Sequence, residues 1–435
     1  MHPRMTGAFV AMVFVLTGLV SAQDRFGSLR GAVEDEQGAA VPGVTVTMTN
    51  AVTGDVRRFV TDGHGQYLAA GLNPGRYAVS FELSGFSRVD RPDIAVLLGR
   101  GFQVDAMLRV GQLTETVLVA AESAPTVDTR STLIAHNVTA EEFDRLPKAR
   151  SFQSIALTAP SVNSGEIEGG FQINGASGAE NSFTVDGVVT NGLIYGQSRQ
   201  NTVFEYLQEV QVKTSGISAE YGGALGGVIS AVTKSGGNVF RGEGHYYYAG
   251  SPLSAAPVRR LVLNPIDDAT VGYAQDHKSP VHNHEFGGSI GGPIVGNRLF
   301  FYGAYSPRHE RKTNTYNATD GTPDIARSIW TQQAFGKLSY AASRFNATWS
   351  ALWTPTKATG THSFAWYNGL HPNQYVGNVA SLRSDLERGY EINQVNTSGT
   401  VDITVTDTAF IRARGGIFSD RYTDIGIPLI TSYAY

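Results

Sequence analysis

Cysteine is absent from the 435 residues, and lysine is absent before Lys148. The first absence excludes a disulfide framework and a lipid anchor on cysteine, so the chain must be stabilised by its hydrophobic cores. The second excludes an isopeptide crosslink in the front part of the chain, because that bond needs a lysine amine. Charged residues are only 17% of the chain and the net charge is −4, which gives no electrostatic footprint for nucleic acid.

Long apolar runs are also absent. Residues 8–20 form an apolar run of 13 residues, whereas a transmembrane helix needs about 20, and no later segment is long enough. Arg4 precedes this run and the small residues Val20-Ser21-Ala22 follow it, which is typical of a cleavable signal. We therefore predict that residues 1–22 are a signal peptide, and that any membrane contact of the mature chain is made by a β-barrel.

Glycine and aromatic residues are abundant, with 50 Gly, 19 Tyr and 21 Phe, and this mixture is typical of turn-rich β structure. Val44, Val46 and Met48 alternate with threonines, and turn signals such as Asn73-Pro74-Gly75 recur about every ten residues. Short strands at this spacing predict a β-sandwich over residues 24–110.

Four motifs in this region resemble the carboxypeptidase regulatory-like domain, a sandwich similar to transthyretin and to carbohydrate-binding modules. They are GAV at 31–33, VPGVTV at 41–46, TDGHGQY at 61–67 and GLNPGRY at 71–77. The resemblance implies a spacer or interaction module.

A β-branched, alternating segment lies in the linker that follows, residues 111–132. An extended segment of this kind can add itself as a strand to the sheet edge of another protein. It also resembles the energy-coupling box of TonB-dependent receptors. The residues of this candidate TonB box are Glu115, Thr116, Val117, Leu118, Val119 and Ala120. The alternative is that the segment is the last strand of the sandwich or plain linker.

The pattern of residues 125–238 predicts a small α+β unit. Short helices are expected from Thr139 and at 151–157, and strands at 171–175, 182–188 and 207–212. The order resembles the plug domain of TonB-dependent outer-membrane receptors. The motif residues are Asp186, Gly187, Tyr221, Gly222, Gly223, Gly226 and Gly227. We expect the glycines to allow close packing of backbones, and the stretch 221–237 to be the hinge to the next domain.

Residues 239–435 are typical of a partial outer-membrane β-barrel, because amphipathic strands are joined alternately by long polar loops and very short turns. Strands are expected near 239–248, 284–294, 298–307, 331–341, 344–354, 388–404 and 408–418. These seven are far fewer than the roughly 22 of plugged transporters, so we expect a fragment of a longer barrel. Residues 293–305 resemble an early hairpin of the Oar-like subgroup. The residues expected at the lipid interface are Tyr246, Tyr247, Tyr248, Trp349 and Trp353.

No constellation of residues predicts catalysis, a cofactor or a metal site, so we do not expect an enzyme. The H-x-x-E spacing in His282-Asn283-His284-Glu285 matches two ligands of zinc carboxypeptidases, but no helix–strand alternation of a catalytic domain surrounds it. We interpret it as a solvated cluster where a loop meets a strand.

The expected fold is mainly β: a transthyretin-like or carbohydrate-binding-like sandwich, an α+β plug, and the first strands of an incomplete antiparallel transmembrane barrel. The resemblance implies an Oar-like TonB-dependent receptor in the Gram-negative outer membrane, with its sandwich in the periplasm. Such a receptor imports a bulky nutrient of the oligosaccharide, siderophore or peptide class. The implied partners are the TonB–ExbB–ExbD complex, outer-membrane lipid and a small ligand or glycan. The alternative is an adhesion, interaction or export-associated outer-membrane protein without import activity.

Overall fold

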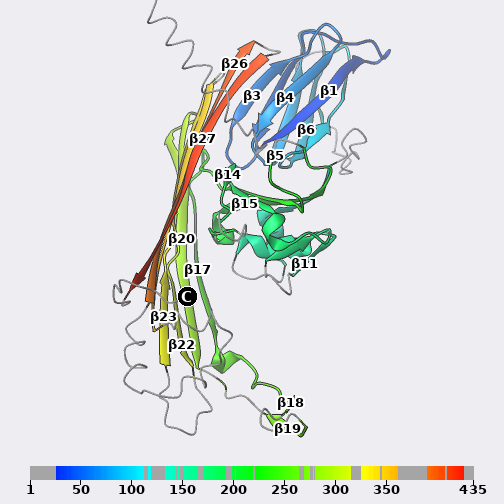
Figure 1. The fold of residues 1–435 in the computed structure, drawn as a ribbon. Helices are drawn as coiled ribbons and strands as arrows, with labels where there is room; N and C mark the ends of the chain where they lie inside the picture. Colours follow the sequence, from blue (N-terminus) through cyan, green and yellow to red (C-terminus); the bar gives the residue numbers. More distant parts are fainter. Residues whose placement is uncertain are drawn as a thin grey trace, which may run out of the picture.

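The structure is a computed structural model with three bodies: a sandwich, a small central unit in the position of the expected plug, and one long curved sheet (Figure 1). It describes residues 26–111, 116–118, 133–143, 145–146, 151–164, 170–192, 198–200, 202–218, 221–263, 269–274, 278, 280–314, 325–342, 345–360, 389–406 and 409–425. Within these residues, no helix is both long and apolar enough to cross a membrane. We call the three bodies the sandwich, the plug and the wall.

Nine strands form the sandwich. They are β1 (Gly27–Asp35), β2 (Thr45–Asn50), β3 (Val56–Val60), β4 (Gln66–Leu72), β5 (Gly75–Glu82), β6 (Arg88–Val96), β7 (Gly101–Gln103), β8 (Ala106–Leu108) and β9 (Thr116–Leu118). One sheet has the order β4–β1–β7, with β8 also paired to β1, and the other has the order β3–β2–β5–β6–β9. Alternate side chains, such as Val46 and Met48 of β2 and Phe81 of β5, fill the core between the two sheets. The predicted sandwich is thus confirmed.

The plug combines short helices with a mixed sheet of order β10–β15–β16–β13–β14 and a separate β11–β12 ribbon. Its elements are β10 (Ile134–Thr139), α2 (Ala140–Phe143), η2 (Phe152–Thr158), β11 (Val162–Ser164), β12 (Phe171–Ile173), η3 (Gly178–Glu180), β13 (Ser182–Val185), β14 (Val188–Val189), η4 (Phe204–Tyr206), β15 (Leu207–Ser215) and β16 (Val228–Thr233). The prediction of a single strand at 182–188 is wrong, because the structure has two strands there, β13 and β14. Asp186 and Gly187 have φ angles of 49° and 78°, which make a tight hairpin turn between β13 and β14.

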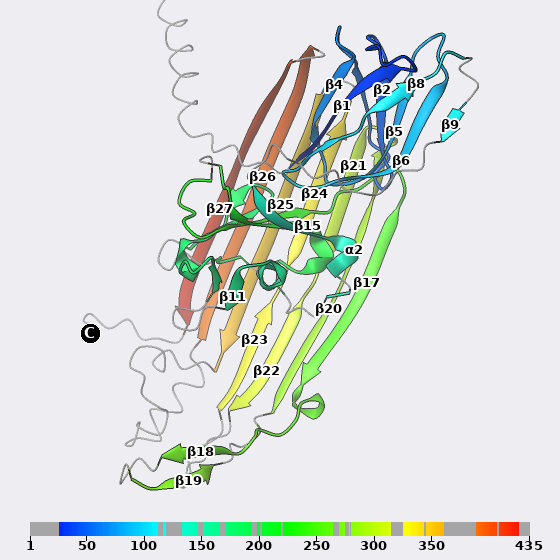
Figure 2. The same cartoon turned by 90° about the vertical axis from the view of Figure 1, so that its right-hand side faces the viewer.

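The wall is an antiparallel sheet of nine strands. They are β17 (Arg241–Gly250), β20 (Val281–Val295), β21 (Leu299–Tyr305), β22 (Arg308–Asn314), β23 (Ile325–Thr331), β24 (Ala334–Ala341), β25 (Phe345–Thr359), β26 (Gly389–Thr406) and β27 (Ala409–Ile425). β22 continues the course of β21, and β24 continues that of β23, so the nine strands follow seven courses, as expected. A small hairpin of β18 (Arg260–Leu263) and β19 (Val271–Ala274) lies beyond the far end of the wall (Figure 2).

One long loop of the predicted barrel is shorter than expected. The segment 308–330 was expected to be a connector, but β22 and β23 extend the wall through most of it. In contrast, the turns between β20 and β21 and between β26 and β27 are as short as predicted. The long–short alternation of connectors therefore holds for the described strands.

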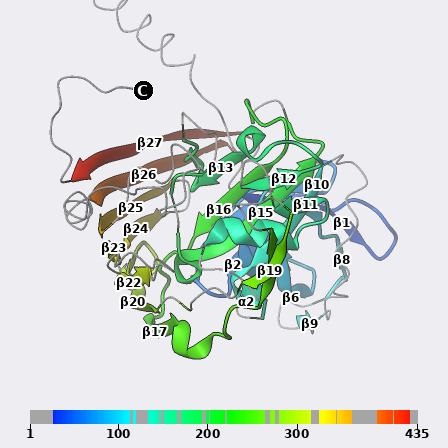
Figure 3. The same ribbon diagram turned by 60° about the horizontal axis from the view of Figure 1, so that its bottom comes forward.

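The two faces of the wall have different chemistry. Figure 3 shows the wall curving around the plug, which covers its concave face. On that face Phe335, Lys337 and Ser350 are buried, whereas Leu338 and Trp349 on the convex face are exposed. The concave face thus presents mainly polar side chains to the plug, with an apolar patch at Phe335, and apolar side chains face outward, as in a transmembrane barrel.

The aromatic residues expected at the lipid interface divide between these faces. Tyr246, Tyr248, Trp349 and Trp353 lie on the convex face, as their strand register shows. The expectation of a lipid-facing position is wrong for Tyr247. This residue faces the plug and donates a hydrogen bond to Glu205 Oε1 at 3.0 Å. Side chains point alternately to opposite faces of a strand, so three consecutive tyrosines cannot share one face.

The expected hinge is also displaced. Most of the second half of the stretch 221–237 forms β16, an inner strand of the plug sheet, so the glycines at 222–227 lie within the plug. The chain leaves the plug after β16 and passes between the other bodies at Gly236 and Gly237. A Cβ on Gly236 would lie 2.0 Å from the Phe301 carbonyl oxygen of the wall, and one on Gly237 would lie 2.6 Å from Thr53 Cα of the sandwich.

Candidate functional site at the plug–wall interface

A buried polar network joins the β13–β14 turn of the plug to the wall. Asp186 accepts hydrogen bonds from the Thr233 amide at 3.1 Å, the Thr233 hydroxyl at 2.6 Å and the Ser350 hydroxyl at 2.9 Å. Lys337 Nζ lies 3.9 Å from Asp186 Oδ1 and donates to the carbonyl and hydroxyl oxygens of Thr233, both at 3.0 Å. Asp186 and Lys337 are only 2% and 3% exposed. Their charges therefore compensate each other across the interface.

A second contact is formed around Tyr206, the last residue of η4. Its ring stacks on Phe335 of the wall with centroids 5.8 Å apart, and its hydroxyl donates to the Gln333 carbonyl at 2.8 Å. The Gln333 side chain accepts from the Val203 amide at 3.1 Å. Tyr206, Val203, Phe335, Tyr302 and Leu352 form a small apolar cluster of their own, separate from the plug core.

The third contact lies at β26 and β27. Arg199 pairs with Asp420 at 2.8 Å, and Gln394 donates to the Arg199 carbonyl at 2.7 Å. Asn396 donates to Gln200 Oε1 at 3.0 Å. All of these interactions are polar. Like the Asp186 network, the contact consists of an ion pair and hydrogen bonds. Hydrogen bonds and ion pairs thus hold the plug at the first and third of these contacts.

The sandwich is fixed to the plug through the backbone of Leu98. The Leu98 amide donates to both carboxylate oxygens of Glu209 at 3.1 Å, and its carbonyl accepts from the side-chain amides of Asn137 and Gln211. Glu209 is buried, and this desolvation raises its pKa to about 7, against the opposing effect of the hydrogen bonds from Asn137 and Leu98.

The other plug motif residues have mainly structural roles. The Tyr221 ring lies 3.7 Å below the Nζ atom of the buried Lys213. A Cβ on Gly226 would meet Asn181 at 2.5 Å, and one on Gly227 would meet Ile173 at 2.4 Å, so close packing accounts for these two glycines.

The remaining motif glycines differ from this pattern. Gly222 and Gly223 face open space, so they are not needed for close packing. Gly223 instead has a φ of 77°, a conformation that favours glycine. Gly187 needs its glycine because its φ is 78°; a Cβ there would lie 2.6 Å from the end of the Arg414 side chain of β27, which is flexible and can move aside.

The candidate TonB box lies only partly within the described residues. Thr116, Val117 and Leu118 form β9, which pairs in parallel with Arg88, Val89 and Asp90 of β6. Glu115, Val119 and Ala120 lie outside the described residues. The backbone therefore places the centre of the segment as an edge strand of the sandwich, the second of the two roles that the sequence left open.

The interpretation of His282-Asn283-His284-Glu285 as a solvated loop cluster is wrong. All four residues belong to β20, and Glu285 is 4% exposed. His282 accompanies Tyr248 on the convex face, whereas Glu285 lies on the concave face, because residues three apart in a strand point to opposite sides. The H-x-x-E pair therefore cannot bind one metal ion.

The sequence patterns do not identify four of these interface residues, namely Lys337, Ser350, Glu209 and Leu98. An Asp-Gly pair is a strong hairpin signal, so the turn at Asp186 could have been found. Its partners could not, because the hydrogen bond from Ser350 to Asp186 joins residues 164 positions apart.

Three family models match successive parts of the chain. They are the Carboxypeptidase regulatory-like domain at residues 28–109, the TonB-dependent Receptor Plug Domain at 128–228 and the Outer membrane beta barrel domain at 232–380. Over 392 residues the chain is 30% identical to the TonB-dependent transporter Oar of Myxococcus xanthus. The chain belongs to the TonB-dependent receptor family. Its place is accordingly the Gram-negative outer membrane.

The match to the Myxococcus xanthus transporter covers 82% of this chain and 36% of that protein, so the chain spans about a third of this TonB-dependent relative. Among solved structures, the outer membrane transporter YddB of Escherichia coli has 17% identity and a TM-score of 0.48, over 65% of this chain and 38% of that one. A mutant ferric enterobactin receptor of Pseudomonas aeruginosa, in complex with enterobactin, has 17% identity and a TM-score of 0.46, over 68% and 42%.

Proposed function

We propose that the protein is an energy-coupled receptor that imports a bulky polar nutrient when its plug is drawn away from the wall. The observation that carries this proposal is the polar character of the plug–wall interface. The groups around Asp186 and Arg199 exchange hydrogen bonds that water can replace once the plug moves. A large apolar interface would instead resist separation in a water-filled lumen.

The backbone of β9 supports coupling to the TonB–ExbB–ExbD complex. Within the described residues, β9 is an edge strand joined to β6 by three residue pairs, Thr116 to Leu118. A short edge strand separates easily from its sheet because few hydrogen bonds must break. Its backbone can then add to the sheet of another protein. The candidate TonB box can therefore serve both as the last strand of the sandwich and as the segment on which TonB pulls.

The position of the sandwich supports a periplasmic location for it. Asn238, beside the sandwich residue Gly54, accepts a hydrogen bond from the Asn297 amide in the short turn between β20 and β21. Short turns face the periplasm in outer-membrane barrels. The β18–β19 hairpin lies at the opposite end of the wall, where long loops would meet ligand (Figure 1).

A cavity of about 260 Å³ between plug and wall supports a polar ligand. Its lining includes the charged side chains of Arg199, Glu285, Arg308 and Glu310, together with Gln394. Such a lining suits hydroxyl, carboxylate or amide groups, which the oligosaccharide, siderophore and peptide classes all carry.

The coupling step can be tested without knowing the ligand. We would measure binding of the purified periplasmic domain of TonB to the detergent-solubilised receptor, comparing Val117→Pro with Val117→Ala. Proline removes a backbone donor and disrupts strand addition, so we expect at least a tenfold loss of affinity, while alanine preserves binding. Equal binding by both variants would contradict the assigned box. Adhesion to cells or matrix without any TonB binding would support the alternative function.

A further inference from the structure

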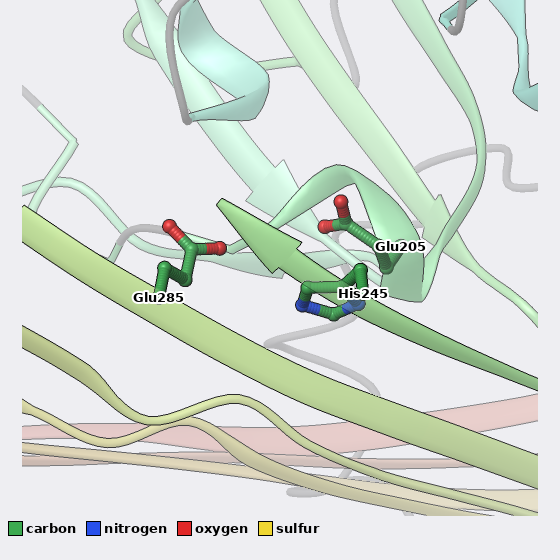
Figure 4. Close-up of side chains that lie close together, drawn as sticks. All are labelled: Glu205, His245 and Glu285. Carbon is green, nitrogen blue, oxygen red and sulfur yellow. The ribbon is translucent and has the colours of Figure 1, made fainter. Parts of the chain in front are cut away.

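Three potential metal ligands meet where the plug touches the first two strands of the wall. Glu205 belongs to η4, His245 to β17 and Glu285 to β20 (Figure 4). One ligand atom from each lies within 4.8 Å of those of the other two. The three side chains come from separate elements and from both bodies, so they are not a chance run of acidic residues along one strand.

The surroundings of His245 leave it free to bind a ligand. Its Nε2 atom lies 3.2 Å from the Ser306 hydroxyl, while its Nδ1 atom is buried and has no hydrogen-bond partner within the described part of the chain. Gly287 is opposite His245 in the sheet, and a Cβ there would lie 2.8 Å from the imidazole. The glycine thus makes room for the ring, and the bond to Ser306 can fix its orientation.

The two carboxylates supply the charge that a cation needs. Glu285 is 4% exposed and also lines the polar cavity between plug and wall. Glu205 is half-buried and is oriented by the hydrogen bond from Tyr247. Two carboxylates this close together repel each other, and a divalent cation between them would remove that repulsion.

We propose that Glu205, His245 and Glu285 form a binding site for a first-row divalent cation such as Zn²⁺. An imidazole beside two carboxylates favours such an ion over Ca²⁺ or Mg²⁺, which prefer oxygen ligands alone. Ligand atoms around a tetrahedral Zn²⁺ are about 3.3 Å apart, because each bond is about 2.0 Å long. Because all three ligand atoms lie within 4.8 Å of one another, each separation would close by at most about 1.5 Å, which side-chain rotation can provide.

A cation bound here joins the plug to the wall. The site replaces the sequence-based expectation that the chain binds no metal, and it uses Glu285 with partners other than His282. A metal site here does not depend on the proposed import function. Binding of TonB to the Val117→Pro variant tests the import proposal and leaves this site unaffected.

The test is equilibrium dialysis of the purified receptor against Zn²⁺, with bound metal counted by mass spectrometry. The unmodified receptor should bind one equivalent of Zn²⁺ at this site. In His245→Gln and in Glu285→Gln the affinity for this equivalent should fall at least tenfold, so that it is lost on dialysis. The matched control is His284→Gln, which changes the same residue type next to Glu285 but on the convex face, and it should keep that equivalent. Unchanged binding by His245→Gln would overturn the proposal, as would loss in His284→Gln alone, which would place the ion on the convex face.

Hydrogen exchange provides a second readout that does not depend on how well the buried variants fold. In the unmodified receptor, Zn²⁺ at 100 times its Kd should slow opening of the contact between η4 and the wall about 100-fold. In the Glu205→Gln variant, which changes a half-buried side chain, Zn²⁺ should no longer slow this exchange. If Zn²⁺ leaves exchange in η4 unchanged in the unmodified receptor, the three side chains are only a hydrogen-bonded part of the interface and the proposal fails.

Discussion

Replacing Lys337 by methionine should loosen the contact between the β13–β14 turn and the wall by roughly 3–5 kcal/mol, the usual cost of removing one partner of a buried ion pair. Methionine preserves most of the side-chain volume but leaves the charge of Asp186, which is 2% exposed, without its cation. The change also removes two hydrogen bonds to Thr233, each 3.0 Å long. Since about 1.4 kcal/mol corresponds to a factor of ten, opening of this contact should become more frequent by two to four orders of magnitude.

The assay is hydrogen exchange, followed by mass spectrometry on peptides that cover β13, β14 and β16 in the detergent-solubilised receptor. A double-mutant cycle isolates the pair itself. Asp186→Asn should accelerate exchange on its own, whereas adding it to Lys337→Met should cost little more than the worse single change. Fully additive effects would mean that Asp186 and Lys337 do not interact.

Lys357→Met is the matched control. Lys357 pairs with Glu391 at 2.8 Å, a shorter distance than that between Lys337 and Asp186, but the two side chains are 59% and 50% exposed. Exposed pairs contribute only about 0–1 kcal/mol, so exchange in the plug should remain the same. The reasoning is refuted if Lys337→Met changes exchange in β13 and β16 by less than about threefold.

Two further predictions concern the contact between sandwich and plug and the packing inside the plug. Because burial raises the pKa of Glu209 to about 7, its proton is retained in the folded state above the ordinary value of 4.5, so the associated stability is complete below pH 4.5 and is lost as pH rises through 7. Exchange at Leu98, corrected for intrinsic rates, should therefore be slower at pH 5 than at pH 8, and Glu209→Gln should abolish this difference. Gly227→Ala should lower the thermal stability of the plug, because its Cβ would lie 2.4 Å from Ile173 and 2.8 Å from a backbone oxygen, whereas Gly222→Ala faces open space and should be neutral. Equal melting temperatures for the two alanine variants would contradict the packing role of Gly227.

Local patterns were sufficient to predict the three bodies. Alternation in β2, with Val46 and Met48 buried, follows directly from the sequence of that strand. The same rule fails for β22, RHERKTN, where the sequence pattern predicts a loop. Its concave face lines a polar cavity through Arg308 and Glu310, and its convex face carries His309, so neither face shows an apolar signal.

The interface could not be predicted, because it depends on contacts between distant segments. Leu98 and Glu209 are 111 positions apart, and Lys337 and Thr233 are 104 apart. A lysine in an amphipathic strand reads as a lumen-facing residue, and only the fold places Asp186 opposite it. Likewise, the sequence marks His245 and Glu285 only as strand residues. Their proximity to Glu205 depends on how the fold places η4 beside them.

In the proposed mechanism, the plug leaves the wall when TonB pulls on it. Ser350 is 5% exposed beneath the plug, and the chain has no other thiol, so Ser350→Cys would be the single site for a membrane-impermeant maleimide added to living cells. We predict that labelling rises when the inner membrane is energised and stays at the background level after Val117→Pro. Labelling that is the same with and without energy, or unaffected by Val117→Pro, would contradict the account.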